Sequence, residues 1–252
     1  MSNVFLKKLF SFKNQNDDSK SSDPFLKFLK PILGYNPRNI EVFKEAFTHR
    51  SAQKKDENGN SINFERLEFL GDALLGASAA THLYYKAPDQ QEGYLTKMRS
   101  KIVSRKQLNA VSEQLGLLDY LEPLNNHANL GEDVNGDMLE ALVGAIYVDG
   151  GIKAVEKFIQ DKIIDPYADL DRLEHTITSH KSLILEWSQK SRNTIRFNTF
   201  EEQNAEDLQV FVSVIRLNDK VISKGRGTSK KKAEESAAKR AYYSLQKKIE
   251  KV

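Results

Sequence analysis

Cysteine is absent from this 252-residue chain, and its absence excludes several kinds of chemistry at once. Without a thiol the protein cannot form disulfides, bind zinc through thiolates or use a cysteine nucleophile. The five histidines are scattered and show no spacing that would replace such a zinc site. The lack of cysteine fits a reducing compartment, so we expect a cytoplasmic protein.

Long hydrophobic runs are also missing. In the N-terminal stretch MSNVFLKKLF, Lys7 and Lys8 interrupt the apolar residues, so the stretch resembles neither a signal peptide nor a membrane span. We expect residues 1–23 to form a disordered tail and expect no membrane partner. A short helix that touches a membrane or a partner is the alternative for this tail.

Charge is unevenly distributed along the chain, although the net charge at pH 7 is only +3. Residues 24–170 contain 17 Lys and Arg against 21 Asp and Glu, a net of −4. Residues 171–252 contain 17 against 11, a net of +6. This split indicates two parts with different tasks, of which the basic part is suited to bind a polyanion.

Helical periodicity dominates the acidic part, which we expect to be an all-α domain over residues 24–170. Turn signals such as DENGN and APDQ separate its segments. The predicted helices lie near residues 25–33, 39–47, 64–85, 93–100, 104–115, 137–148 and 151–164. The charged segment 171–178 has no persistent apolar stripe, and we expect it to be a linker.

A different pattern follows over residues 179–249. After a short predicted helix at 180–190, TIRFNTFEE and LQVFVSVIRL alternate with β-branched and aromatic residues. An Asn218-Asp219 turn then leads into a third strand, KVISKG, and an Ala- and Lys-rich run from Ser229 returns to helix. The predicted fold class is therefore an all-α domain followed by an α-β-β-β-α domain.

The segment FERLEFLGDALLG, residues 64–76, is strongly apolar and yet carries three carboxylates. Glu65, Glu68 and Asp72 lie within roughly 60° of one another on a helix. Apolar residues on both sides indicate that this acidic ridge is partly enclosed, whereas the alternative is a helix with an exposed acidic face. Enclosed like charges are costly unless positive charge lies among them.

A second acidic pair, Asp137 and Glu140, stands one turn apart at the start of another apolar segment. One interpretation is a helix cap, with Asp137 as N-cap and Glu140 as its capping-box partner. The other is a metal site, because two enclosed helices that each offer carboxylates provide the oxygen ligands that hard divalent cations prefer.

These segments resemble a known family. ERLEFLGDA at 65–73 is similar to the signature of the ribonuclease III endonuclease domain. FTHRS at 47–51, EGYLTKMRSKIVS at 92–104 and GDMLEALVGAIYVDGG at 136–151 resemble further blocks of that domain, in the same order. KGRGTSKKKAEESAAKRA at 224–241 resembles the closing half of a double-stranded-RNA-binding domain.

The resemblance implies a set of site residues. The family's four metal-binding carboxylates correspond to Glu68, Asp72, Asp137 and Glu140, of which Asp72 and Glu140 match the most critical catalytic acids. Glu65 and Glu92 match further acids that line the cleavage valley and handle substrate or a second ion. The implied cofactor is Mg²⁺, with Mn²⁺ as a substitute, and no small-molecule cofactor is expected.

The implied activity is that of a homodimeric endoribonuclease that cuts double-stranded RNA to 5′-phosphate and 3′-hydroxyl ends. Ribosomal RNA precursors and other structured transcripts are the substrates that the resemblance implies. Phe69 matches an aromatic side chain that inserts into the partner subunit, whereas an ordinary core Phe within one chain is the alternative.

The rival function is a catalytically inactive RNA-binding scaffold, which would be free to lose carboxylates that this chain keeps.

In the basic part, Lys230, Lys231 and Lys232 crowd the first turn of the last helix, where positive charge is unfavourable unless an anion binds. A solvated lysine-rich face is the alternative. By resemblance, Gly225 and Gly227 shape the approach to RNA. The stripe expected to contact a minor groove comprises Ser182, Glu186 and Gln189.

The sequence departs from the family's pattern at two places in this part. Leu185 stands where a glutamine is common, and the loop 201–209 lacks the family's Gly-Pro-x-His element.

Overall fold

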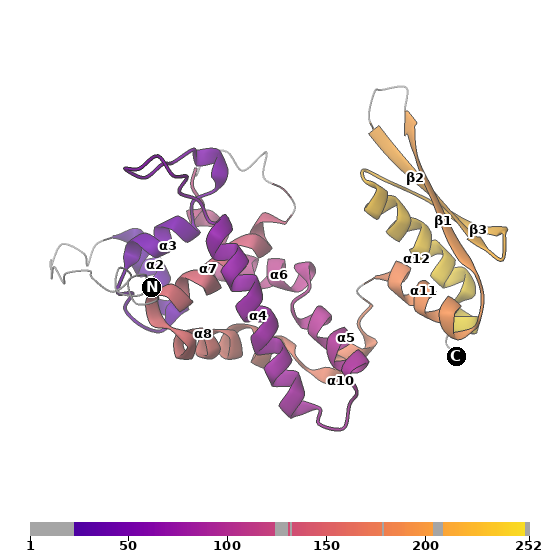
Figure 1. Ribbon diagram of the computed structural model, residues 1–252, viewed down its shortest axis with the longest axis horizontal. Helices are drawn as coiled ribbons and strands as arrows, with labels where there is room; N and C mark the ends of the chain where they lie inside the picture. Colours follow the sequence, from indigo (N-terminus) through magenta and orange to yellow (C-terminus); the bar gives the residue numbers. More distant parts are fainter. Residues whose placement is uncertain (1–22, 124–130, 132, 178, 204–208, 250–252) are drawn as a thin grey trace, which may run out of the picture. The chain divides into compact units, whose positions relative to one another are not determined.

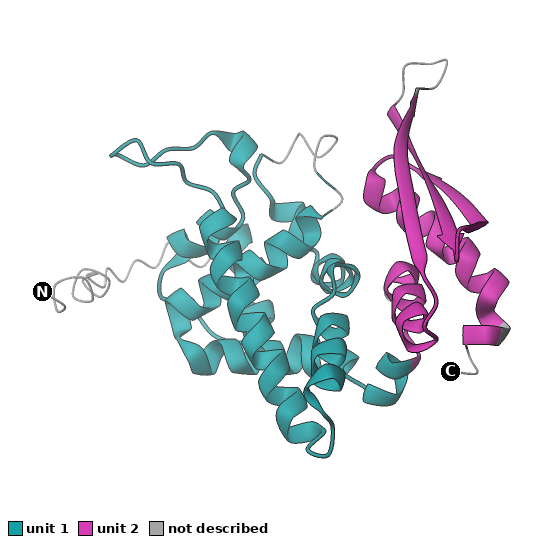
Figure 2. Cartoon of the chain, turned by 45° about the vertical axis from the view of Figure 1, so that its right-hand side comes forward, with its two compact units in different colours: residues 1–174 teal, residues 175–252 magenta. Residues whose placement is uncertain are grey.

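The computed structural model describes residues 23–123, 131, 133–177, 179–203 and 209–249. The predicted N-terminal tail, apart from Asp23, lies outside the described residues. The chain divides into two compact units, Met1–Glu174 and His175–Val252 (Figure 2). Within the described part of the chain, no helix is both long enough and apolar enough to cross a membrane.

The first unit is helical (Figure 1), as the apolar periodicity predicts. Ser104 caps one of its helices by accepting a hydrogen bond from the amide of Gln107, which satisfies one of the free amides at that helix end. The unit contains α2 (Pro24–Leu33), α3 (Ile40–Ala46), η2 (Arg50–Ala52), α4 (Glu65–Lys86), α5 (Glu92–Ile102), α6 (Arg105–Leu115), η3 (Leu117–Tyr120), α7 (Val134–Gly150), α8 (Ile152–Ile159), the π-helix η5 (Gln160–Ile164), α9 (Asp165–Tyr167) and α10 (Leu170–His175).

Helix α7 lies at the centre of the first unit and is buried along most of its length. It crosses α4 at unusually short range, because two glycines stand at the crossing. A Cβ atom at Gly71 of α4 would lie 1.7 Å from the carbonyl oxygen of Glu140, and one at Gly144 of α7 would lie 2.2 Å from that of Leu67. Only hydrogen fits at these two positions, so the glycines set the distance between the two helices.

The predicted linker 171–178 is helical up to His175, within α10. Leu173 is buried, and the Lys101 side chain, itself only 5% exposed, donates hydrogen bonds to the carbonyl oxygens of Leu173 and Glu174. The Tyr94 hydroxyl donates to the Glu174 carboxylate at 2.6 Å. Helix α5 therefore holds the first part of this segment, up to Glu174, within the first unit, which the charged sequence of the segment did not indicate.

The second unit has the order α11 (His180–Lys190), β1 (Ile195–Gln203), β2 (Gln209–Leu217), β3 (Lys220–Gly227) and α12 (Lys230–Ile249). Its antiparallel sheet has the strand order β1-β2-β3 (Figure 1). Asn218 and Asp219 adopt positive φ values, as a two-residue hairpin turn requires. Ile184, Ile215 and three alanines of α12 form a separate core. The predicted fold class is confirmed in both units.

Candidate metal centre and RNA-binding surface

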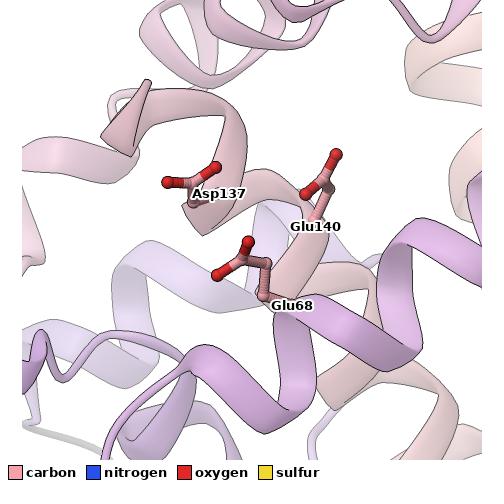
Figure 3. Close-up of side chains that lie close together, drawn as sticks. All are labelled: Glu68, Asp137 and Glu140. Atoms are coloured by element: carbon pink, nitrogen blue, oxygen red, sulfur yellow. The ribbon is translucent and has the colours of Figure 1, made fainter. Parts of the chain in front are cut away.

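Three carboxylates meet where α4 crosses α7 (Figure 3). Glu68 comes from α4, and Asp137 and Glu140 come from successive turns of α7. One ligand oxygen of each lies within 4.8 Å of those of the other two. The glycine-lined crossing accounts for this meeting, because Gly71 packs directly against the backbone of Glu140.

Burial and mutual repulsion raise the pKa of two of these acids, Glu140 and Glu68. Glu140 is only 7% exposed, and desolvation, reinforced by the charges of Asp72, Asp137 and Glu68, raises its pKa to about 7. Desolvation also raises the pKa of Glu68, and Asp137 adds to the effect. A bound cation would relieve this repulsion, so the donor set fits a divalent metal ion that prefers oxygen ligands.

Arg105, at the first position of α6, supplies positive charge to this cluster. Its guanidinium donates a hydrogen bond to Asp137, and its Nε lies 3.6 Å from a carboxylate oxygen of Asp133. Arg105 is not among the site residues predicted from the sequence. A signal for it existed, because a positive charge in the first turn of a helix is unfavourable unless an anion lies nearby.

The capping interpretation of Asp137 and Glu140 is wrong. Helix α7 begins at Val134 with Asp133 in the N-cap position, and no side chain of the described residues caps it through a hydrogen bond. Asp137 therefore lies inside the helix, one turn after its start, and its carboxylate faces Arg105. Glu140 lies deeper, among the buried residues of α7.

The remaining predicted acids are not members of the three-carboxylate cluster. Asp72 is exposed on α4 and acts electrostatically on both Glu68 and Glu140. Glu65 is exposed and forms an ion pair with Arg50 at 3.5 Å. Glu92, at the start of α5, accepts a hydrogen bond from Thr96. The acidic ridge of α4 is thus enclosed only at Glu68.

Phe69 is 80% exposed, so its interpretation as a core residue within one chain is wrong. It shares α4 with Tyr85, which is 76% exposed. Tyr85 and Ile152 line a groove of about 510 Å³ between α4 and α8, and Ile152 is 48% exposed. Phe69 does not line this groove, where Tyr85 and Ile152 are exposed together as apolar side chains are at interaction surfaces.

On the second unit, Lys230, Lys231 and Lys232 are all exposed in the first turn of α12. The glycines of β3 pack tightly beneath this helix. A Cβ atom at Gly225 would lie 2.1 Å from the amide nitrogen of Ala237, and one at Gly227 would lie 2.5 Å from that of Ala233. The two glycines thus permit the close packing that holds the lysine-bearing turn against the sheet.

The predicted minor-groove stripe lies along α11. Ser182 and Gln189 are exposed, and Glu186 is half-buried and forms an ion pair with Lys190 at 3.2 Å. The unusual loop 201–209 falls largely on residues 204–208, which lie outside the described residues.

Together these features define a class of protein: a helical unit with an acidic metal-type site, joined to a basic α-β-β-β-α unit. Residues 39–167 match the family described as Ribonuclease-III-like. Residues 180–245 match the double-stranded RNA binding motif. The chain therefore belongs to the ribonuclease III family, and the resemblance drawn from its sequence is confirmed.

Individual relatives agree. The chain is 46% identical over 246 residues to the protein named Ribonuclease 3 from Flavobacterium psychrophilum, covering 98% of each chain. It is 37% identical to Ribonuclease 3 from Bacteroides fragilis, covering 82% of this chain and 72% of that protein. The crystal structure of the nuclease domain of ribonuclease III from Campylobacter jejuni is 29% identical, with a TM-score of 0.51, and the match covers 59% of this chain and all of that one.

Proposed function

We propose that this protein is a Mg²⁺-dependent endoribonuclease that hydrolyses double-stranded RNA and leaves 5′-phosphate and 3′-hydroxyl ends. The observation that carries the proposal is the meeting of Glu68, Asp137 and Glu140 in a chain of the ribonuclease III family. The double-stranded RNA binding motif in the same chain supports the choice of substrate. The rival interpretation as an inactive scaffold is disfavoured, because a scaffold has no need for three acids at one helix crossing.

Glu68, Asp137 and Glu140 would hold the ion, with Asp72 as the further ligand on the exposed side. A bound divalent cation favours ionisation of water and stabilises negative charge on the leaving 3′ oxygen. The burial of Glu140 fixes its side chain, and the glycine crossing fixes the spacing of α4 and α7, so Glu68, Asp137 and Glu140 are held close together without a bound ion. Glu65 and Glu92 are proposed to handle substrate.

The working form is proposed to be a homodimer. The exposure of Phe69, at 80%, supports this, because an aromatic ring of this size exposed to water is unfavourable unless a second surface covers it. The groove beside Tyr85 and Ile152 provides additional apolar surface on the same unit. Two paired units would present two acidic sites, one for each strand of a duplex.

The second unit is proposed to supply affinity for the duplex. The lysines of α12 and the amides of its first turn would contact phosphates, and Ser182, Glu186 and Gln189 of α11 would lie in a minor groove. Precursors of ribosomal RNA and other structured transcripts in the cytoplasm are the substrates that we propose.

A single cleavage assay tests the proposal. A labelled RNA duplex and each of its separate strands are incubated with the full chain, with Mg²⁺ or with a chelator. We expect cleavage of the duplex in Mg²⁺ alone, with products that a 5′-phosphate-dependent exonuclease degrades. Equal cleavage of the single strands, or cleavage in the presence of chelator, would contradict the proposal.

A further inference from the structure

Arg105 of α6 lies among the carboxylates of the acidic site, where it contacts Asp137 and Asp133. We propose that its guanidinium is a built-in counter-cation, which neutralises Asp137 until a divalent ion binds and then gives way to that ion. The inference rests on the proposed function, because it takes Asp137 to be one of the metal ligands.

The geometry makes Arg105 and a metal ion competitors for the same atoms. The guanidinium donates to a carboxylate oxygen of Asp137, and Asp137 belongs to the cluster whose ligand atoms lie within 4.8 Å of one another. An oxygen engaged by a guanidinium has less electron density to offer a cation. The positive charge of the guanidinium would also repel a divalent ion bound to Asp137. The Asp137 side chain is only 23% exposed, so water screens that repulsion poorly.

The influence of Arg105 extends beyond its direct partner. Its charge acts on Glu140 and Glu68 as well as on Asp137. One guanidinium thus offsets part of the repulsion within the whole cluster, which is the task that a bound metal ion would also perform.

A purely structural role does not account for this placement. Helices α6 and α7 are already joined by the Asn109 side chain, which accepts a hydrogen bond from the Gly136 amide at 2.7 Å. Leu108 and Val111, each 2% exposed, anchor α6 in the core. The Arg105 side chain is 45% exposed, so it can leave Asp137 and be hydrated at little cost.

Binding of Mn²⁺ to the full chain, measured by calorimetry without RNA, tests the proposal. Arg105→Gln should bind Mn²⁺ more tightly than the wild type by on the order of tenfold, since it removes one unit charge a few ångströms from the ion. Lys106→Gln is the matched control, because Lys106 is the next residue of α6, is exposed, and loses the same charge. We expect it to change affinity less than twofold. Arg105→Lys, which keeps the charge, should lie between the wild type and Arg105→Gln.

Thermal unfolding gives a second readout that does not depend on catalysis. In chelator, Arg105→Gln should lower the melting temperature by about 2 to 4 °C, because the carboxylates lose their counter-ion. In saturating Mn²⁺ this deficit should disappear, because the ion takes over the same role. Lys106→Gln should match the wild type in both conditions.

The outcomes separate this inference from the proposed function. Equal Mn²⁺ affinity in Arg105→Gln and Lys106→Gln would overturn the inference, as would weaker binding in Arg105→Gln, which would mean that Arg105 orients Asp137 for the ion. A melting deficit that persists in saturating Mn²⁺ would also overturn it. A wild-type protein that binds no Mn²⁺ would instead overturn the proposed metal site itself.

Discussion

The two units hold their functional charges in opposite ways. In the helical unit the carboxylates converge at a helix crossing, and Glu140 is only 7% exposed. In the second unit the lysines of α12 are spread over an exposed helix turn. Enclosed charges interact strongly, and the energy of their interaction depends closely on the distances that packing sets. Exposed charges interact weakly and are screened by salt. Chemistry therefore belongs with the first arrangement, and electrostatic affinity with the second.

The largest expected effect comes from removing the charge of a proposed metal ligand. Glu140→Gln, and equally Asp72→Asn, should reduce duplex cleavage by about a thousandfold or more, since the stabilisation that a metal ion supplies is worth several kcal/mol. Duplex binding in Ca²⁺ should be nearly unchanged, because neither variant alters the basic surface. Cleavage rates and gel shifts measure the two properties separately. A variant that cuts near the wild-type rate in saturating Mg²⁺ would remove its residue from the proposed site.

Phe69→Ala tests the exposed apolar surface of the first unit. If the ring is buried in a partner subunit, its removal should weaken the dimer by about 3 to 5 kcal/mol. Sedimentation over a range of protein concentrations measures this change. The fold of the single chain should be unaffected, because Phe69 is 80% exposed within it. An intact dimer in a folded variant would show that Phe69 does not anchor the interface.

Gly71→Ala tests whether the helix crossing sets the geometry of the site. The added methyl would meet the carbonyl oxygen of Glu140 at 1.7 Å, so α4 and α7 must separate. We expect a loss of about 1 to 3 kcal/mol of stability and about a hundredfold loss of cleavage rate. Gly76→Ala is the control, because it lies on the same helix with no atom within 4 Å of the added Cβ, and it should be neutral or slightly stabilising. Equal behaviour of the two variants would mean that the crossing tolerates separation.

The smallest effect is expected on the second unit. Replacing Lys230, Lys231 and Lys232 by Gln should weaken duplex binding and reduce the slope of log affinity against log salt by about 0.7 to 0.9 for each phosphate that the lysines no longer neutralise. Single-turnover cleavage at saturating protein should be unchanged, because the acids lie in the other unit. Titration of one duplex at several salt concentrations measures the slope. An unchanged slope would assign the affinity of this unit to α11 rather than to the lysines.

Local properties of this protein were predictable from its sequence. Apolar periodicity located the long helices to within a few residues, because the spacing of apolar residues in an amphipathic helix depends only on residues three or four positions apart. The Asn218-Asp219 turn was predictable for a similar reason, since few residue pairs tolerate positive φ. Blocks such as ERLEFLGDA identified the family, and with it the acids to examine. The linker was less predictable, since α10 depends on Lys101, a residue distant in sequence.

Only the tertiary structure decided which of the acids meet and what neutralises them. Glu65, Glu68 and Asp72 look alike on the helix, yet of these three only Glu68 has a ligand oxygen within 4.8 Å of those of both Asp137 and Glu140, because the direction of the α4–α7 crossing selects it. Arg105 and Asp137 are 32 residues apart, so no local pattern pairs them. Periodicity likewise could not show whether Phe69 is buried or exposed. Apolar residues lie on both sides of the acidic ridge of α4, so the helix has no single apolar face. Such pairings depend on the packing of distant segments, whose relative positions are set by the balance of contacts across the whole core.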